Sequence, residues 1–354
     1  MKWFRTAALT LALLVVGVAG YYAYSFYNFA DDGNEDSRFQ KFEQPKIGDS
    51  ASGPKVSADT IDYNEPPKWE GTERVNILLL GGDSRGLRKD EIPRSDTMMI
   101  LSIDPVTKKA HLFSLLRDTY VKIPGHGSNR INSAIVLGGP KLAMRTAGEL
   151  TGLDIQYYVY TDFEGFIHLI DEIGGIEIEV EKDMRYSSKA DGPEYDINLK
   201  KGLQVLDGKQ ALQYVRFRHD ALSDFARTER QRKLLTAVAE KMQKTSSIIR
   251  LPRILAAIDP YIETNLTVSE MIKLGALGFE ARANEVVGVQ VPPSNLLREE
   301  TVGGADVLTV DPARLQRHIQ ELFAAAEEEP ARPGAKDAAV AAPGGAGSSA
   351  GNEG

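Results

Sequence analysis

Short apolar runs alternate with amphipathic stretches between residues 75 and 291. The run Val75–Leu80 is continuously apolar and ends at a Gly-Gly pair, which is typical of a strand buried on both faces. Spacings of three and four residues between apolar positions predict helices. The pattern predicts strands at Val75–Leu80, Thr97–Ile103, Ala110–Leu116, Tyr157–Tyr160, Ile176–Val180, Tyr214–Arg218 and Val286–Val291, and helices at Lys141–Leu150, Phe163–Ile173, Asp207–Leu212, Arg227–Gln243 and Ser269–Ala281.

This alternation of strands and helices predicts an α/β domain built in layers. The second and third strands are joined through Asp104-Pro105, and so short a connection cannot be a parallel crossover. The central sheet is therefore expected to be mixed.

An uncharged, mostly apolar run covers Thr6–Ala30, with Lys2 and Arg5 before it and four acidic residues soon after it. About 20 apolar residues span a bilayer, and a positive flank stays in the cytoplasm. The run predicts a transmembrane anchor with the rest of the chain outside the cell membrane, a single-pass type II arrangement. The alternative is a cleaved signal peptide, although apolar cores of signal peptides are shorter.

The remaining boundaries follow from composition. Residues 1–30 form the cytoplasmic tip and anchor, and residues 31–72 are polar with scattered Pro and Gly, as in a linker. Residues 73–323 form the folded domain, and residues 324–354, rich in Ala, Gly and Pro, are expected to be a disordered tail. The chain has no Cys, which excludes disulfides and thiol catalysis, and its net charge of -8 with no basic stripe argues against nucleic acid.

Four arginines stand out in the stretch 214–231 of this acidic chain: Arg216, Arg218, Arg227 and Arg230. Arginine keeps its charge, and its planar fork matches phosphate oxygens. The first two alternate on the predicted strand and the last two share a helix face, so both pairs could point to one pyrophosphate pocket. The alternative is a solvated surface held by salt bridges.

Acidic residues follow the first predicted strand, where ligands bind in α/β sheets. Asp83 and Asp96 are candidate carboxylates for Mg²⁺, which takes one or two carboxylates together with phosphate oxygens and water. Arg85 and Arg94 lie two positions from them. The alternative is a polar loop with an Asp cap. Further charged candidates are Arg117, Asp118, Arg130 and Asn132, for which a structural ion pair and a helix-cap loop are the alternatives.

Taken in order, the blocks read NILLLGGDSR, RSDTMMILSID, SLLRDTYVKIPG, RINSAIVLGG, INLKKGLQVLDGKQALQYVRFR and DFARTERQ. Together they resemble the LytR-CpsA-Psr family of cell-wall glycopolymer ligases. The resemblance implies an α–β–α domain that moves a glycan with a phosphate from a polyprenyl-pyrophosphate carrier to a hydroxyl of peptidoglycan. The glycan is teichoic acid or a capsule-like polysaccharide. A polyprenyl-pyrophosphate hydrolase and a non-catalytic transcriptional attenuator remain alternatives.

The resemblance also implies roles for individual residues. Asp83 and Asp96 match carboxylates that hold Mg²⁺, or Mn²⁺ in its place, and a lipid-linked donor requires an apolar tunnel, expected around Leu142–Leu150 and Phe163–Ile170. The implied catalytic residues are Asp83, Arg85, Asp96, Arg117, Arg216 and Arg218, and the implied substrate contacts are Arg94, Arg130, Asn132, Asp224, Arg227 and Gln231.

Overall fold

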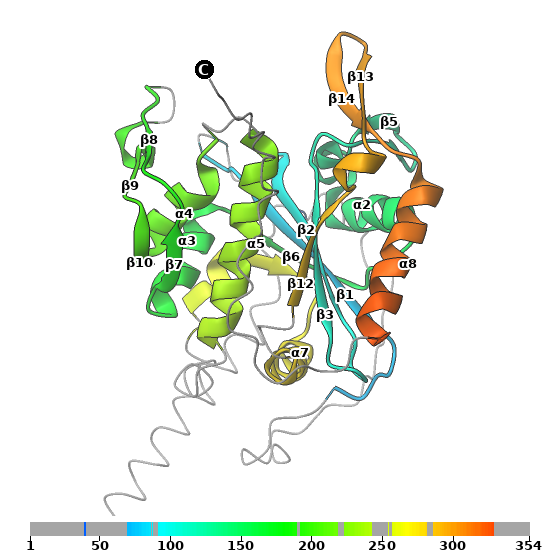
Figure 1. Cartoon of the computed structure of the whole chain (residues 1–354), viewed down its shortest axis with the longest axis horizontal. Helices are drawn as coiled ribbons and strands as arrows, with labels where there is room; N and C mark the ends of the chain where they lie inside the picture. The colour runs from blue at the N-terminus through cyan, green and yellow to red at the C-terminus, as the bar shows by residue number, and fades with distance from the viewer. Residues whose placement is uncertain are drawn as a thin grey trace, which may run out of the picture.

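A six-stranded mixed sheet lies at the centre of the computed structural model (Figure 1), which describes Phe39 and residues 69–85, 87, 91–189, 192–218, 223–242, 254, 257–281 and 286–328. The α/β class and the mixed sheet predicted from the sequence are thereby confirmed. The strands lie in the order β11 (Ile262–Thr264), β6 (Tyr157–Thr161), β1 (Val75–Gly82), β2 (Ser95–Ile103), β3 (Ala110–Leu115) and β12 (Val286–Val291).

The pairing within the sheet explains its mixed character. Strands β1, β2 and β3 are antiparallel neighbours, whereas β6 runs parallel to β1 and β12 runs parallel to β3. The tight β2–β3 connection is closed by Asp104, whose Oδ1 accepts hydrogen bonds from the backbone N–H groups of Val106 (2.8 Å) and Thr107 (3.1 Å). An aspartate that caps its own turn allows the chain to reverse within a few residues.

Side chains of β1 alternate between the two faces of the sheet, as the period of two requires. Leu78 and Leu80 pack in a core with α2 (Ala134–Thr151) and α8 (Pro312–Glu328). Val75 and Ile77 pack on the opposite face with α7 (Val268–Glu280). Helices thus cover both faces of β1 (Figure 1), which is why its sequence is apolar throughout.

A second core joins α3 (Phe163–Glu172), α4 (Gly208–Arg216) and α5 (Ser223–Met242) to β7 (Ile176–Val180) and β10 (Gly202–Leu206). Asp162 and Asp207 cap α3 and α4 by accepting from backbone N–H groups of the first turn. A Cβ at Gly208 would lie 2.4 Å from the carbonyl oxygen of Ile167, so the close approach of α3 and α4 requires glycine there.

Three small hairpins extend from this body. They are β4 (Tyr120–Ile123) with β5 (Gly127–Arg130), β8 (Met184–Tyr186) with β9 (Ile197–Leu199), and β13 (Arg298–Val302) with β14 (Ala305–Thr309). The β13–β14 hairpin projects from the domain beside β5 (Figure 1). Short 3₁₀ turns complete the chain at Ile131–Ser133, Pro193–Tyr195, Asp259–Tyr261 and Ser294–Leu296.

One predicted strand is wrong. Tyr214–Arg218 was expected to be extended, but helix α4 continues to Arg216 and only Phe217 and Arg218 leave it. The capping box of Asp207 with Gln210 starts this helix, and Leu212 and Val215 continue its apolar spacing for another turn. The other predicted strands and helices are present, with ends that differ by a few residues.

Helix α8 continues to Glu328, beyond the expected boundary at Phe323. Phe39, within the expected linker, is buried against Tyr160 with ring centroids 5.2 Å apart. The expected anchor at Thr6–Ala30 lies outside the described residues, and none of the helices within them is long and apolar enough to cross a membrane.

Candidate functional site

The two candidate metal carboxylates lie at the same end of the two central strands of the sheet. Asp83 follows directly after β1, and Asp96 is the second residue of β2, whose first residue, Ser95, pairs with Gly82. Because β1 and β2 are antiparallel, the end of one strand lies beside the start of the other. The register shifts at Gly82, where an added Cβ would lie 2.4 Å from the hydroxyl oxygen of Tyr160.

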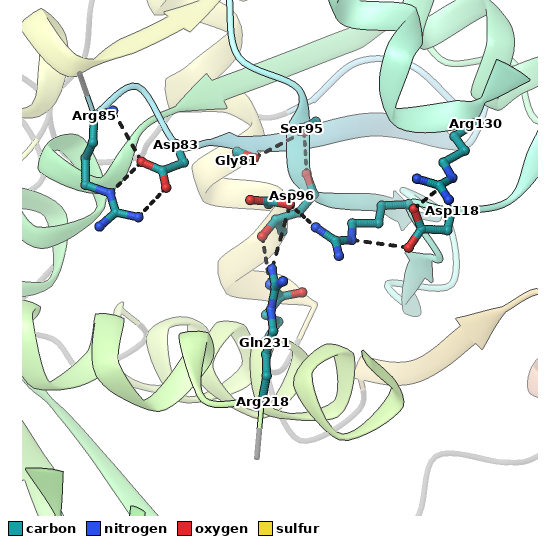
Figure 2. A network of polar contacts seen from close by, with 11 residues as sticks. Gly81, Asp83, Arg85, Ser95, Asp96, Asp118, Arg130, Arg218 and Gln231 are labelled. Atoms are coloured by element: carbon teal, nitrogen blue, oxygen red, sulfur yellow. Dashed lines mark hydrogen bonds and ion pairs between the residues drawn. The ribbon is translucent and has the colours of Figure 1, made fainter. Parts of the chain in front are cut away.

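Arginines pair with both carboxylates (Figure 2). The Arg85 guanidinium donates hydrogen bonds to both carboxylate oxygens of Asp83, with Nε 2.7 Å from Oδ1. Asp96 accepts a hydrogen bond from Nη1 of Arg117, which follows β3, and lies 3.8 Å from Nη2 of Arg218. Arginines from three separate segments therefore converge on two carboxylates at the sheet edge.

This setting keeps Asp83 ionised. Partial burial works against its charge, but the side-chain and backbone hydrogen bonds from Arg85, together with the charges of Arg85 and Arg216, outweigh it. The pKa of Asp83 consequently lies below its usual value. A lowered pKa makes this carboxylate a ligand for a cation rather than a strong proton acceptor at neutral pH.

Two aromatic rings support the arginines beside Asp83. The Arg85 guanidinium lies 4.2 Å from the ring centroid of Tyr195 and 5.1 Å from that of Phe163. The Arg216 guanidinium lies 5.3 Å from each of the same two rings, and its Nη1 donates to the Tyr195 carbonyl oxygen at 3.2 Å. The rings hold two positive charges close together without neutralising them, which prepares the site for an anion.

A chamber of about 540 Å³ opens behind these charged groups. Its inner wall is apolar and comes from α3, α4, α5 and the sheet, with Phe166, Leu169, Val215, Leu235 and Val238 among its residues. Its polar end carries four guanidinium groups and three carboxylates: Arg85, Arg216, Arg218, Arg227, Asp83, Asp96 and Asp162. An apolar cavity with a cationic mouth suits an amphiphile that has an anionic head.

A second pocket of about 360 Å³ shares Asp83 and Asp96 with the chamber. Its lining is polar apart from one proline: Asp83, Pro93, Arg94, Asp96, Arg117, Asp118, Arg130 and Asn132. Asp118 lies between Nε of Arg117 (3.5 Å) and Nε of Arg130 (3.4 Å). Figure 2 shows Asp96 between the Asp83–Arg85 pair on one side and the Asp118–Arg130 pair on the other.

Eleven of the twelve predicted site residues therefore line one or both of these pockets, which share Asp83 and Asp96. Arg227 and Gln231 reach the chamber from helix α5, and Gln231 Nε2 donates to Thr97 Oγ1 at 2.8 Å. The side chain of Asp224 lies outside the described part of the chain. Arg230 is buried away from the site, where its Nε lies 2.9 Å from Glu181 Oε1. This arginine makes a salt bridge, but it does not belong to the solvated surface of the alternative.

The expected tunnel wall is right for one helix and wrong for the other. Phe163–Ile170 lines the chamber, but Leu142–Leu150 belongs to α2, and Ala143, Ala147 and Leu150 pack in the core on the opposite face of the sheet. The sequence pattern did not predict that α4 and α5 also line the chamber, or that the Tyr195 ring supports the arginines. Apolar spacing shows that a helix has a buried face but not which layer that face meets.

Comparison with known proteins agrees with this geometry. A profile described as the LytR_cpsA_psr family matches residues 29–324. The chain belongs to the LytR-CpsA-Psr family. A curated relative, "Regulatory protein MsrR" of Staphylococcus aureus (strain Mu50), is 37% identical over 236 residues, 66% of this chain and 68% of the relative. Another, "Polyisoprenyl-teichoic acid--peptidoglycan teichoic acid transferase TagU" of Enterococcus faecalis (strain V583), is 34% identical over 252 residues, 71% of this chain and 79% of the relative.

Solved structures share the fold of this LytR-CpsA-Psr protein. The crystal structure of B. subtilis TagV aligns with a TM-score of 0.61 and 26% identity, covering 73% of this chain and 100% of that one. The structure of TagT bound to LI-WTA aligns with a TM-score of 0.56 and 25% identity, covering 74% and 94%. Within the described residues of the family domain, no three His, Asp or Glu side chains cluster as a protein-only metal site.

Proposed function

We propose that this protein is a membrane-anchored phosphotransferase of cell-wall synthesis. It moves a teichoic-acid-type glycopolymer from a polyprenyl-pyrophosphate carrier to a hydroxyl of peptidoglycan. The proposal rests mainly on one observation: an apolar chamber of about 540 Å³ has an arginine-lined mouth. The name of the relative TagU and the structure of TagT bound to LI-WTA support this class of donor.

Each part of the donor has a counterpart in the cavity. The prenyl chain enters the apolar chamber, because each buried methylene contributes about 0.8 kcal/mol. The pyrophosphate lies at the mouth among Arg85, Arg216, Arg218 and Arg227, whose four positive charges exceed the three negative charges there. Phosphoryl transfer depends mainly on aligning the reacting groups and neutralising phosphate charge, and the arginines do both.

The proposal includes Mg²⁺, or Mn²⁺ in its place, at Asp83 and Asp96. Two carboxylates fit a cation that takes its other ligands from phosphate oxygens and water, and both line the mouth where the pyrophosphate would lie. Arg85 and Arg117 pair with these carboxylates, and both guanidinium groups would be available to phosphate oxygens if Asp83 and Asp96 held a cation instead. The bound cation supplies further neutralisation of phosphate charge.

A lipid-linked donor also requires a location at the membrane. We propose that Thr6–Ala30 is an uncleaved type II anchor carrying a three-layer α–β–α domain outside the cell, because Lys2 and Arg5 precede an uncharged run of sufficient length. Protease added to protoplasts should then digest the domain. A protected domain, or a mature form that begins near Tyr21, would contradict this placement.

Two alternatives use parts of the same molecule. A hydrolase would bind the same donor but pass the glycan phosphate to water. A regulatory role is suggested by the name of the relative MsrR, yet regulation alone needs neither an apolar chamber nor an arginine-lined mouth. The test is to incubate the full chain with lipid-linked glycan, with and without peptidoglycan oligomers. Release of polyprenyl phosphate that depends on the oligomers supports transfer, and release independent of them supports hydrolysis.

A further inference from the structure

The 360 Å³ polar pocket has no evident role in holding the lipid. It shares only Asp83 and Asp96 with the apolar chamber, and its remaining lining is polar except for Pro93. Three guanidinium groups and three carboxylates line it, so its charges balance. A balanced pocket does not concentrate anions as the mouth of the chamber does, and it suits a neutral ligand with many hydroxyl groups.

A buried amide points to such a ligand. Asn132 is 5% exposed and lines the pocket, and its Oδ1 has no hydrogen-bond partner among the residues that the structure describes. Its position is set by the 3₁₀ turn Ile131–Ser133 and by its backbone N–H, which donates to the Arg117 carbonyl oxygen at 3.3 Å. A buried polar atom without a partner is costly, and a hydroxyl can satisfy either end of an amide because it both donates and accepts.

We propose that this pocket binds the acceptor sugar and that Asn132 holds it there by a hydrogen bond to one of its hydroxyl groups. The inference rests on the proposed transferase function and adds where the acceptor lies. Because Asp83 and Asp96 line both cavities, a sugar in the polar pocket and a pyrophosphate at the chamber mouth meet across these carboxylates. That arrangement holds the two reactants as neighbours, which is the main contribution that positioning makes to a bimolecular reaction.

The transfer forms one bond to phosphorus and breaks another. The acceptor oxygen forms a bond to the phosphorus that carries the glycan, while the bond from that phosphorus to the bridging oxygen breaks. The bridging oxygen keeps the electron pair and leaves as polyprenyl monophosphate. The hydroxyl proton is released to solvent, and the product is a glycan joined to the acceptor by a phosphodiester.

The projecting β13–β14 hairpin holds the outer wall of this acceptor pocket. The Asp306 carbonyl oxygen accepts from Arg130 Nη2 at 2.7 Å, and Leu308 N donates to the Asp118 carbonyl oxygen at 3.2 Å. A strand bridge between Thr119 and Leu308 adds to these contacts. The hairpin therefore fixes two pocket residues, Asp118 and Arg130, from a segment far along the chain.

The test uses the full chain in detergent with Asn132→Leu, an exchange of similar size, and Asn132→Ser as a second variant. Asn198→Ala, an exposed asparagine on β9 outside both cavities, is the matched control. Kinetics are measured against the concentration of a soluble peptidoglycan oligosaccharide. Donor binding is measured with a lipid-linked disaccharide and with polyprenyl pyrophosphate alone, and thermal unfolding is followed for each variant.

Asn132→Leu should raise the KM for the oligosaccharide roughly tenfold, the size of one hydrogen bond, with kcat at saturating acceptor within about twofold of the parent. Asn132→Ser should recover part of the loss, and neither variant should weaken donor binding. The Leu variant should be at least as heat-stable, because it removes a buried polar atom without a partner. An unchanged acceptor KM, or loss of folding in the Leu variant, overturns the inference.

Two further outcomes separate the explanations. Weaker binding of the lipid-linked disaccharide but not of bare polyprenyl pyrophosphate would assign the pocket to the donor sugars and overturn the inference. An absence of transfer by the unaltered protein would instead overturn the proposed function on which it rests.

Discussion

The substitution Arg218→Ala tests whether the arginines at the chamber mouth bind the pyrophosphate or only stabilise the fold. The Arg218 side chain is 43% exposed, and its ion pair is long, with Nη2 3.8 Å from Asp96 Oδ1. Exposed ion pairs of this kind contribute about 0–1 kcal/mol to the free energy of unfolding. The substitution should therefore leave the folded domain almost as stable as before.

The effect on catalysis should be much larger. Arg218 lines the polar end of the chamber, where a pyrophosphate would replace its weak contact with a charge-assisted hydrogen bond. Loss of one donor aimed at developing charge costs about 2–4 kcal/mol of transition-state stabilisation. At 1.36 kcal/mol for each factor of ten, kcat/KM should fall roughly 30- to 1,000-fold.

The assay measures kcat/KM for the lipid-linked donor together with thermal unfolding. Arg314→Ala is the matched control, because Arg314 is exposed on α8 and makes a comparably long ion pair, 3.9 Å to Asp311. The control should change neither quantity appreciably. The reasoning is refuted if Arg218→Ala keeps its kcat/KM, or if it loses activity only in proportion to lost folding.

Three further predictions concern stability, metal and lipid. Burial and the charge of Arg74 lower the pKa of His111 to about 4. The unfolded chain, with a pKa near 6.5, then binds the proton first, so stability falls by about 2–4 kcal/mol as pH drops from about 6.5 to 4. His111→Phe should flatten the plot of unfolding free energy against pH between about pH 4 and 6.5. Parallel plots for the variant and the parent protein would contradict this prediction. Calorimetry should show that Mg²⁺ binds weakly to the protein alone and more tightly when a polyprenyl pyrophosphate is present. Asp83→Asn and Asp96→Asn should each abolish this gain in Mg²⁺ affinity, and the double variant should lose little more than either single variant. Equal Mg²⁺ affinity with and without the lipid would contradict a site shared with the pyrophosphate. Leu235→Trp, which fills the chamber, should raise KM for long-chain donors and spare short-chain ones, and an equal effect on both would argue against prenyl binding there.

Much of the sheet and of its charged edge could be predicted from local pattern. The apolar run at Val75–Leu80 identified a buried strand, and a carboxylate directly after it had to lie at the sheet edge. The short connection at Asp104 indicated that β2 and β3 are not joined by a parallel crossover, but no local signal placed β1 beside β2, and that pairing is what brings Asp83 close to Asp96. The guanidinium groups were recognisable because four lie close together in an acidic chain.

The rest depended on packing between distant segments. The predicted strand at Tyr214–Arg218 was wrong because alternation over a few residues cannot outweigh a capping box that starts a helix seven positions earlier. Phe163 and Tyr195 carry no sign that their rings will meet Arg85. The β13–β14 hairpin is largely exposed on both faces and has little apolar alternation to reveal it, although it holds Arg130.

The reaction proposed for this protein is transfer of a phosphorylated glycan to peptidoglycan. The most direct test incubates the full chain with a polyprenyl-pyrophosphate-linked teichoic acid precursor and peptidoglycan oligosaccharides in ¹⁸O-enriched water, followed by mass spectrometry. The account predicts a phosphodiester-linked product without ¹⁸O and an equimolar amount of polyprenyl monophosphate. Release of the glycan as a free phosphate that carries ¹⁸O, with no linked product, would contradict it.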